Sequence, residues 1–386
     1  MRKICVVIGS RANYSSIKSA LKAIKVHPKL ELQIVANASA VLEKYGNVAQ
    51  LIENDGFTIN EKFYMLIEGE NPTTMAKSTG LGLLEIPTIF ERLQPDVVFT
   101  IGDRYETMST TIAASYMNIT IAHSMGGEVT GTIDESIRHA VTKFAHIHFP
   151  ANEDSKIRIQ KMGEDERFIF NVGCPRIDLV KKEINKKNSD ILLKEFFENF
   201  KGVGRDMDIK DNFLLVSQHP VTTEYGVNRE NINYTLEALD QLKMPTIMLW
   251  PNADAGGELI SKAIRTFREK NNPKWLAIYK NLPIKIYINL MKTTLCLIGN
   301  SSSGIREGAF IGTPVVNIGS RQNSRMKGPN CIDVGNNTKE IKDAILKQIK
   351  HGKYQSYHLY GDGNAGTKIA KILSDVELKI QKTITY

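Results

Sequence analysis

The chain has 386 residues, too many for one ordinary hydrophobic core, and this length predicts two domains of roughly 150–200 residues each. Its 42% hydrophobic and 24% charged residues are typical of a globular protein and exclude a disordered or fibrous one. The formal charge of +8 is spread along the chain without aromatic interleaving, which favours an anionic small molecule over a nucleic acid as partner.

Several further classes are excluded. No apolar run reaches the roughly 18–20 residues that cross a bilayer, so we expect no membrane segment. The four cysteines lie far apart and form no CxxC pair, which excludes a disulfide framework and predicts a reducing, cytoplasmic location. His146 and His148 are two residues apart on an expected strand, but no third ligand has a suitable spacing, so we predict no metal site.

In the first half of the chain, short apolar strands alternate with helical periodicity, which is typical of a parallel α/β sheet. The strands are expected at Ile4–Ile8, Leu32–Ala36, Val97–Ile101, Ile119–Ala122, His146–Phe149 and Phe168–Val172. The helices are expected at Tyr14–Ile24, Met75–Leu93, Glu106–Tyr116, Asp134–Phe144 and Glu153–Met162.

A polar, lysine-rich stretch with one helix, about Leu179–Asp211, follows, and then the alternation restarts. We therefore predict an α/β fold of two Rossmann-like domains, residues 1–178 and 179–360, with a last helix at 365–381 that packs back on the first domain. In the second domain the expected strands are Phe213–Ser217, Thr246–Trp250, Leu276–Tyr279, Leu295–Ile298 and Val315–Ile318, and the helices Glu230–Leu242, Glu258–Lys270, Ile284–Met291 and Gly304–Phe310.

Carboxylates follow two of the strands of the first domain, at the carboxyl ends where ligands bind in open α/β sheets. Asp103 comes directly after Val97–Ile101, where it suits acid–base work or a sugar hydroxyl, or the N-cap of the next helix. Paired glycines after Ile119–Ala122 let the backbone turn sharply and present Glu128 at the sheet edge, although a plain surface carboxylate is the alternative.

A third carboxylate, Asp134, begins a helix four residues before Arg138, so the two side chains share a face and can pair. A helix cap with an ordinary ion pair explains this stretch as well as a functional role does. Three carboxylates near neighbouring strand ends within about thirty residues favour the functional interpretation.

In the second domain, Pro220 ends the first strand and leaves His219 at its rim. A glycine- and serine-rich turn, Gly299–Gly304, precedes a helix, and its free N–H groups and positive dipole end suit a phosphate, with a serine-rich N-cap as the alternative. Glu307 is expected one turn inside that helix, where it can accept hydrogen bonds from ribose hydroxyls.

Arg11, after the first strand, is a further phosphate candidate. The chain has no GxxxxGK[ST] loop and no GxGxxG after its first strand, which disfavours a P-loop or a nicotinamide or flavin cofactor.

The chain resembles the hydrolysing UDP-N-acetylglucosamine 2-epimerase family, which makes N-acetylmannosamine for sialic-acid synthesis. The resemblance rests on stretches spread over residues 9–321: GSRANYS, IGDRYE, GGEVTGTIDESIRH, SQHP, WPNADAG and GNSSSGIREGAFIGTPVVNIGSRQ. It implies a glycosyltransferase-B fold with the active site in the interdomain cleft, no cofactor, and a cytoplasmic homodimer or homotetramer that binds a UDP-sugar. Because the animal form carries a fused kinase domain and this chain ends at Tyr386, the resemblance implies the single-function bacterial type.

The resemblance also implies site residues. Catalytic roles fall to Asp103, Glu128, Asp134 and His219. Nucleotide contacts fall to Arg11, Ser15, Asn252, Ser301, Ser302, Glu307 and Arg321, and we place Ala12, Arg104 and Arg138 among the substrate contacts. We expect Ser301 and Ser302, with His219 or an arginine as a cation, to stabilise a departing diphosphate.

Four alternatives stay open at this point. A hydrolysing epimerase of UDP-N,N′-diacetylbacillosamine, on the route to legionaminic acid, would share nearly every residue above. A non-hydrolysing epimerase would return UDP to the intermediate. A glycosyltransferase or a nucleotide-sugar sensor would need the second-domain site but not three carboxylates in the first domain.

Overall fold

The computed structural model describes residues 1–68, 72–130, 133–186, 189–208, 212–251, 256–280 and 282–385. The chain forms two compact units. Unit 1 comprises Met1–Val129, Ile133–Leu179 and Tyr360–Tyr386, and unit 2 comprises Thr130–Thr132 and Val180–Leu359. Within the described ranges, no helix is both long enough and apolar enough to cross a membrane.

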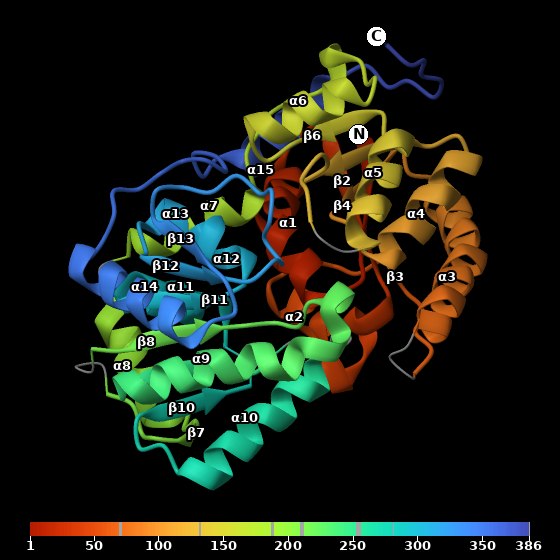
Figure 1. Ribbon diagram of the computed structural model, residues 1–386. Helices are drawn as coiled ribbons and strands as arrows, with labels where there is room; N and C mark the ends of the chain where they lie inside the picture. The colour runs from red at the N-terminus through yellow and green to blue at the C-terminus, as the bar shows by residue number, and fades with distance from the viewer. Residues whose placement is uncertain are drawn as a thin grey trace. The chain divides into compact units, whose positions relative to one another are not determined.

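The described part of unit 1 holds a six-stranded parallel sheet in the order β3-β2-β1-β4-β5-β6. Its central strands are buried along their whole length, as expected of a parallel sheet with helices on both faces (Figure 1). The strand order reverses between β1 and β4, which is the topological switch point of a Rossmann sheet. The strands are β1 (Arg2–Ile8), β2 (Leu30–Ala36), β3 (Glu61–Lys62), β4 (Val97–Ile101), β5 (Thr120–Ser124) and β6 (Ile147–Phe149).

The helices of unit 1 pack in two groups. α3 packs on α4 and α4 on α5, while α1 packs on α2 and on α15. Helix α1 begins at the N-cap Ser10, whose hydroxyl accepts from the Asn13 amide at 3.2 Å, and it buries a stripe at helical spacing. The helices are α1 (Arg11–Val26), α2 (Val48–Asn54), α3 (Pro72–Leu93), α4 (Tyr105–Tyr116), α5 (Ile133–Phe144), α6 (Glu153–Lys161) and α15 (Ala365–Asp375), with 3₁₀ turns η1 (Ala38–Val41), η2 (Glu43–Tyr45) and η3 (Glu166–Phe168).

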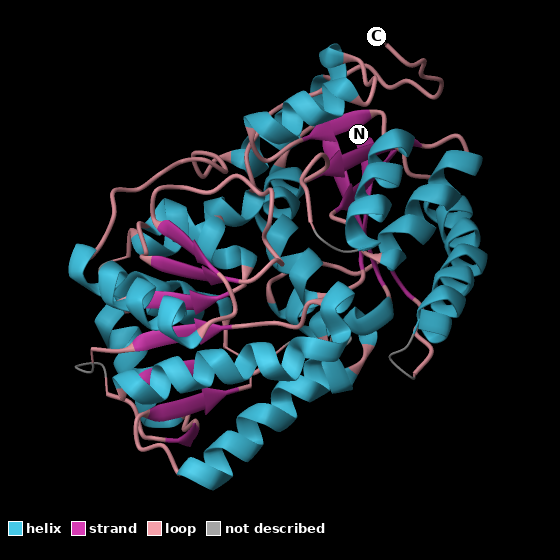
Figure 2. Ribbon diagram, in the orientation of Figure 1, coloured by secondary structure: helices cyan, strands magenta, loops and turns pink. Residues whose placement is uncertain are grey.

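The described part of unit 2 repeats the plan with the order β13-β12-β11-β8-β9-β10-β7, parallel except for β7. The order reverses between β8 and β11, so this sheet has its own switch point. Helices cover both faces here as well (Figure 2). The strands are β7 (Val203–Gly204), β8 (Leu214–Ser217), β9 (Thr246–Leu249), β10 (Leu276–Tyr279), β11 (Cys296–Gly299), β12 (Val315–Ile318) and β13 (Cys331–Val334).

In unit 2, α9 packs on α10 and α14, while α11 packs on α8 and α13. The core joins the inner faces of β8, β11 and β12 to α9, α10 and α14. The predicted α/β class with two Rossmann-like domains is confirmed. The helices are α8 (Ser189–Asn199), α9 (Asn228–Leu242), α10 (Gly257–Asn271), α11 (Ile284–Thr293), α12 (Ser302–Ile305), α13 (Glu307–Ile311) and α14 (Thr338–His351), with the 3₁₀ segment η4 (Thr222–Val227); α7 (Pro175–Ile184) carries the chain from unit 1 into unit 2.

Three predicted elements are wrong in detail. Phe168–Val172 forms no strand, and only Ile169 bridges to His148, because β6 is three residues long and offers little edge. The lysine-rich stretch holds α8 and most of α7 rather than one helix. The last helix ends at Asp375 rather than near residue 381, since Val376 is extended and the segment beyond it is held by side chains of unit 1.

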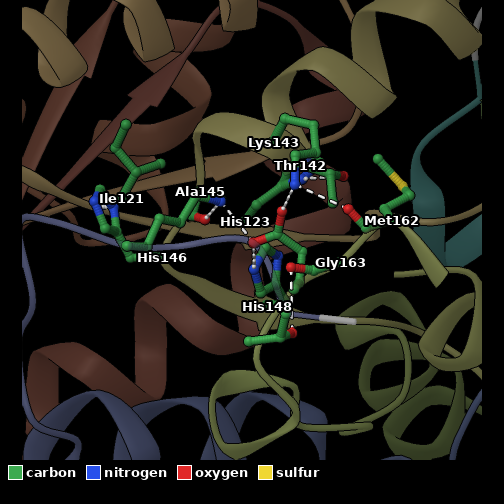
Figure 3. Close-up of polar contacts among 12 residues, drawn as sticks. Ile121, His123, Thr142, Lys143, Ala145, His146, His148, Met162 and Gly163 are labelled. Carbon is green, nitrogen blue, oxygen red and sulfur yellow. Dashed lines mark hydrogen bonds and ion pairs between the residues drawn. The ribbon is translucent and has the colours of Figure 1, made fainter. Parts of the chain in front are cut away.

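The carboxyl-terminal segment 376–385 is fixed to unit 1 by a buried ionic cluster around Glu164, of which Figure 3 labels Lys143 and His148. The Glu164 carboxylate, 3% exposed, accepts from Lys143 Nζ at 2.5 Å, from Lys382 Nζ at 2.6 Å and from His148 Nε2 at 3.2 Å. Burial raises the pKa of Glu164, but the three hydrogen bonds together lower it by more than burial raises it. The resulting pKa is about 2. Lys143 lies on α5, so the cluster ties the end of the chain to that helix.

We predict that Lys382→Met destabilises the protein by about 1–3 kcal/mol, because it leaves the buried Glu164 carboxylate with one cation fewer. Because Glu164 ionises near pH 2 when folded and near 4.5 when unfolded, its contribution is complete above about pH 4.5 and is lost as the pH falls toward 2. The loss should therefore be the same at pH 5 and pH 7 in thermal or urea unfolding. Lys371→Met, an exposed site on α15, is the matched control and should change stability by less than about 0.5 kcal/mol. Equal stabilities for the two variants would contradict the cluster's role.

Candidate functional site

Two groups of predicted site residues lie at the two switch points. In unit 1 the chain leaves β1 at Gly9 and β4 at Gly102, and in unit 2 it leaves β8 at Gln218 and β11 at Asn300. Ligands of open α/β sheets bind where the strand order reverses, because the loops there diverge and leave a crevice between them. Each unit therefore offers one candidate site.

The turn after β4 presents Asp103. Gly102 has φ +76°, a left-handed conformation that favours glycine, and its amide donates to the Ser124 carbonyl at 3.2 Å. The turn is thus tied to the end of β5, and Asp103 follows it with its side chain 24% exposed.

Arg138 of α5 joins the carboxylate-bearing loops. Its side chain is only 3% exposed; Nη2 pairs with the Asp103 carboxylate, and Nη1 donates to the backbone carbonyl of Glu128 at 2.8 Å. We predicted Arg138 as a substrate contact, but its guanidinium binds two protein loops. A buried guanidinium needs an anionic partner, so this contact fixes Asp103 next to the loop that carries Glu128.

The two other predicted carboxylates lie in the loop after β5 and in the first turn of α5. Glu128 is 3% exposed in the loop after β5. Asp134 lies in the first turn of α5, four residues before Arg138 and therefore on the same helix face, and it is partly exposed. The Arg138 guanidinium thus joins the Asp103 carboxylate to the backbone of Glu128, a connection that sequence spacing did not predict.

A second ion pair lies at the β1–β4 switch point. Arg104 Nε donates to the Glu106 carboxylate at 2.7 Å, and Glu106 is 2% exposed. A Cβ on Gly9 would lie 2.3 Å from Cγ of Glu106, so glycine is required there. Glu106 is not among the predicted site residues, because a glutamate in the first turn of a helix is only a weak signal.

Helix α1 starts at the same end of the sheet and holds the remaining predictions for unit 1. Arg11 and Ala12 are exposed in its first turn, and Ser15 is partly exposed one turn later. These positions leave the three residues accessible to an anionic ligand at the helix N-terminus.

In unit 2, the Asn300 side chain makes two hydrogen bonds to the backbone of His219. The Asn300 side chain accepts from the His219 amide at 2.7 Å and donates to the His219 carbonyl at 2.8 Å. Gly299 before it has φ +125°, and a Cβ there would lie 2.3 Å from the Ser217 carbonyl oxygen. The close approach of the two strand ends at this switch point therefore depends on glycine, and it fixes the backbone of His219. The same strand ends border a hollow that Gln218, Glu224, Asn336 and neighbouring residues also line.

The charge state of His219 bears on which group is the expected cation, His219 or an arginine. Burial, and then the positive charge of Arg321, lower its pKa to about 3. His219 is therefore neutral at physiological pH in the free protein, which favours the arginine over His219 as the expected cation. As a neutral imidazole it can still donate one N–H, while Arg321, which donates to the Asn300 carbonyl at 3.1 Å, supplies the positive charge.

The predicted helix over Gly304–Phe310 is two short helices, α12 and α13, interrupted at Arg306. Ser301 is the N-cap of α12, and Ser302 Oγ accepts from Arg306 Nη2 at 2.9 Å. Glu307 is 1% exposed and begins α13 rather than lying inside one continuous helix. Because α12 has only one turn, its dipole is small, and Arg306, missed in the sequence analysis, adds the cation near both serines.

Asn252 lies outside the described residues. Within the described ranges, no group of three or more histidine, cysteine, aspartate or glutamate side chains is arranged to hold a metal ion. Among the described candidates, unit 1 offers carboxylates, and unit 2 offers serines, arginines, Glu307 and His219.

The chain is similar to known epimerases over nearly its whole length. The profile of the family described as UDP-N-acetylglucosamine 2-epimerase matches residues 22–374. A UDP-N,N′-diacetylbacillosamine 2-epimerase (hydrolyzing) of Legionella pneumophila is 33% identical over 381 residues, 99% of this chain and 98% of that protein. A UDP-N-acetylglucosamine 2-epimerase of Neisseria meningitidis is 28% identical over 380 residues, 98% of this chain and 96% of that protein. The crystal structure of a Neisseria meningitidis UDP-GlcNAc 2-epimerase bound to UDP-GlcNAc has the same fold, with a TM-score of 0.80, 17% identity and coverage of 96% and 99% of the two chains.

Proposed function

Because the chain belongs to the UDP-N-acetylglucosamine 2-epimerase family, we propose that it is a hydrolysing 2-epimerase, which releases UDP and a free 2-epimerised acetamido sugar. The observation that supports the proposal is the buried Arg138, which pairs with the Asp103 carboxylate and binds the backbone of Glu128, so that the two carboxylate-bearing loops are joined. A glycosyltransferase or a sensor has no use for such a group.

The chemistry explains why carboxylates are needed. The C2 hydrogen of the sugar has no adjacent carbonyl and is not acidic until the C1–O bond to UDP breaks. UDP then departs with the bonding electrons, and the oxocarbenium-like sugar loses its C2 proton to a carboxylate, giving a 2-acetamidoglucal. Water adds its oxygen at C1, and an acid returns a proton to the opposite face of C2. Hydrogen leaves and returns at the same carbon, so no redox cofactor is required.

The groups of unit 2 suit the departing diphosphate. Arg306 and Arg321 supply positive charge, Ser301 and Ser302 supply hydroxyls, and the neutral His219 supplies one N–H. In this proposal Glu307 accepts hydrogen bonds from ribose hydroxyls, and its carboxylate lies 4.0 Å from Nε of Arg306. The residues of unit 1 then carry the proton transfers.

The identities favour UDP-N,N′-diacetylbacillosamine over UDP-N-acetylglucosamine as the substrate. The Legionella relative is 33% identical and the Neisseria relative 28% identical over almost the same length. We propose that the enzyme works in the cytoplasm, in keeping with four free cysteines, and that it assembles as a homodimer or homotetramer.

We expect UDP release and a free sugar inverted at C2 from both UDP-sugars, with kcat/KM about tenfold higher for the diacetylbacillosamine compound. Tenfold corresponds to about 1.4 kcal/mol, the size of one additional specific contact in the pocket. Coupled UDP detection with NMR of the released sugar measures both. An epimer that stays linked to UDP would mean a non-hydrolysing enzyme, and turnover of neither sugar would overturn the proposal.

Binding and chemistry should separate between the units. Glu307→Gln should weaken UDP binding about tenfold, because an amide is a poorer acceptor for ribose hydroxyls than a carboxylate. Asp134→Asn, a partly exposed site in unit 1, should bind UDP within about twofold of wild type but lose at least about 100-fold in kcat. Calorimetry with UDP and initial rates measure the two effects. Equal losses of UDP affinity in both variants would contradict this division of roles.

A further inference from the structure

A fully buried histidine, His123 of β5, contacts the turn that presents Asp103. Its Nε2 lies 2.9 Å from the Gly102 carbonyl oxygen, and its Nδ1 lies 3.3 Å from the Thr142 hydroxyl of α5. None of the chemistry above uses this residue. Thr142 is next to Lys143, the α5 residue that binds Glu164 (Figure 3).

The contacts assign the proton on the ring. A carbonyl oxygen can only accept, so Nε2 must carry the hydrogen and donate to Gly102. Nδ1 is then an acceptor and faces the Thr142 hydroxyl. Burial lowers the pKa of His123 to about 3, so the ring keeps this neutral form throughout the physiological range.

The ring also touches the loop that leads to Glu128. A Cβ on Gly126 would lie 2.9 Å from Nδ1 of His123 and 2.8 Å from the Thr142 hydroxyl. Both backbone groups of Gly102 are hydrogen-bonded to β5. Its amide donates to the Ser124 carbonyl at 3.2 Å, and its carbonyl accepts from the His123 ring. Asp103 is the next residue.

We propose that His123 is a positioning residue for the epimerase reaction, whose Nε2–H fixes the Gly102 carbonyl and so the direction in which Asp103 is presented. The proposal rests on the proposed function. Arg138 holds the Asp103 carboxylate from one side and His123 holds its backbone turn from the other, so both ends of the residue are fixed. Misplacing a reacting group by about 1 Å can cost about 100-fold in rate.

Two substitutions separate the hydrogen bond from the mere filling of space. In His123→Gln the side-chain amide nitrogen reaches about where Nε2 lies and can still donate to Gly102, whereas in His123→Asn it cannot reach. We expect His123→Asn to lower kcat about 10- to 100-fold with KM and UDP affinity within about twofold of wild type, and His123→Gln to stay within about threefold in kcat. Thr142→Val, which removes the hydroxyl that lies 3.3 Å from Nδ1 of His123 and donates to the Arg138 carbonyl at 2.9 Å, is a milder second variant and should lower kcat about three- to tenfold.

His146→Asn is the matched control. His146 has the same tautomer, since Nδ1 accepts from the Ile121 amide at 3.1 Å and Nε2 contacts the Ile380 carbonyl at 2.8 Å, but it lies at the amino end of the sheet. This variant should lose thermal stability and keep kcat within about twofold of wild type.

Amide hydrogen exchange of the peptide that contains residues 102–104 tests the tether without turnover. It should be faster in His123→Asn than in wild type, His123→Gln or His146→Asn. Active wild type with equal kcat in His123→Gln and His123→Asn, or equal exchange in all four proteins, would overturn the proposal. Wild type that turns over neither UDP-sugar would overturn the proposed function instead, and the exchange rates would still decide whether His123 holds the turn.

Discussion

The buried guanidinium of Arg138 is the constraint on which the site of unit 1 depends. An arginine that is 3% exposed must have its charge balanced inside the protein, and the carboxylate that does so is Asp103. Leaving a buried charge without its partner costs about 3–5 kcal/mol, so the ion pair with Asp103 is a large contribution to the stability of this part of the fold. The second hydrogen bond, to the Glu128 carbonyl, brings the loop after β5 to the same point. The stability of unit 1 and the placement of its carboxylates thus depend on the same contact.

The supports of this contact extend across the unit. Helix α5 carries Arg138, and Lys143 on the same helix is held by Glu164, which in turn binds Lys382 near the end of the chain. The β5 strand supplies His123 and the Ser124 carbonyl to the turn before Asp103. Unit 2 reaches a similar result with neutral groups, since the Asn300 amide holds both backbone groups of His219. Polar side chains thus join the ends of β4 and β5 in unit 1, and Asn300 joins the ends of β8 and β11 in unit 2.

The sequence allowed the fold class, most strands and the main motif positions to be predicted, because alternating apolar strands and helical periodicity are local signals. β4, β10 and β12 begin and end where the apolar runs do. The partner of Arg138 could not be predicted, since Asp103 is 35 positions earlier and no periodicity links them. The interruption at Arg306, the burial of Glu106 and the extended segment after Asp375 likewise follow from tertiary contacts. The site residues could be named from their positions after strands and from the resemblance. Whether a residue can act as an acid, a base or a positioning group depends on contacts that only the structure gives.

The central claim is that the carboxylates of unit 1 move the proton at C2 of the sugar. Turnover in deuterated water, with NMR or mass spectrometry of the released sugar, measures this directly. We predict one deuterium at C2 of every product molecule, with none acquired when the finished product is incubated without enzyme. A released 2-epimer that retains its original C2 hydrogen would contradict the account.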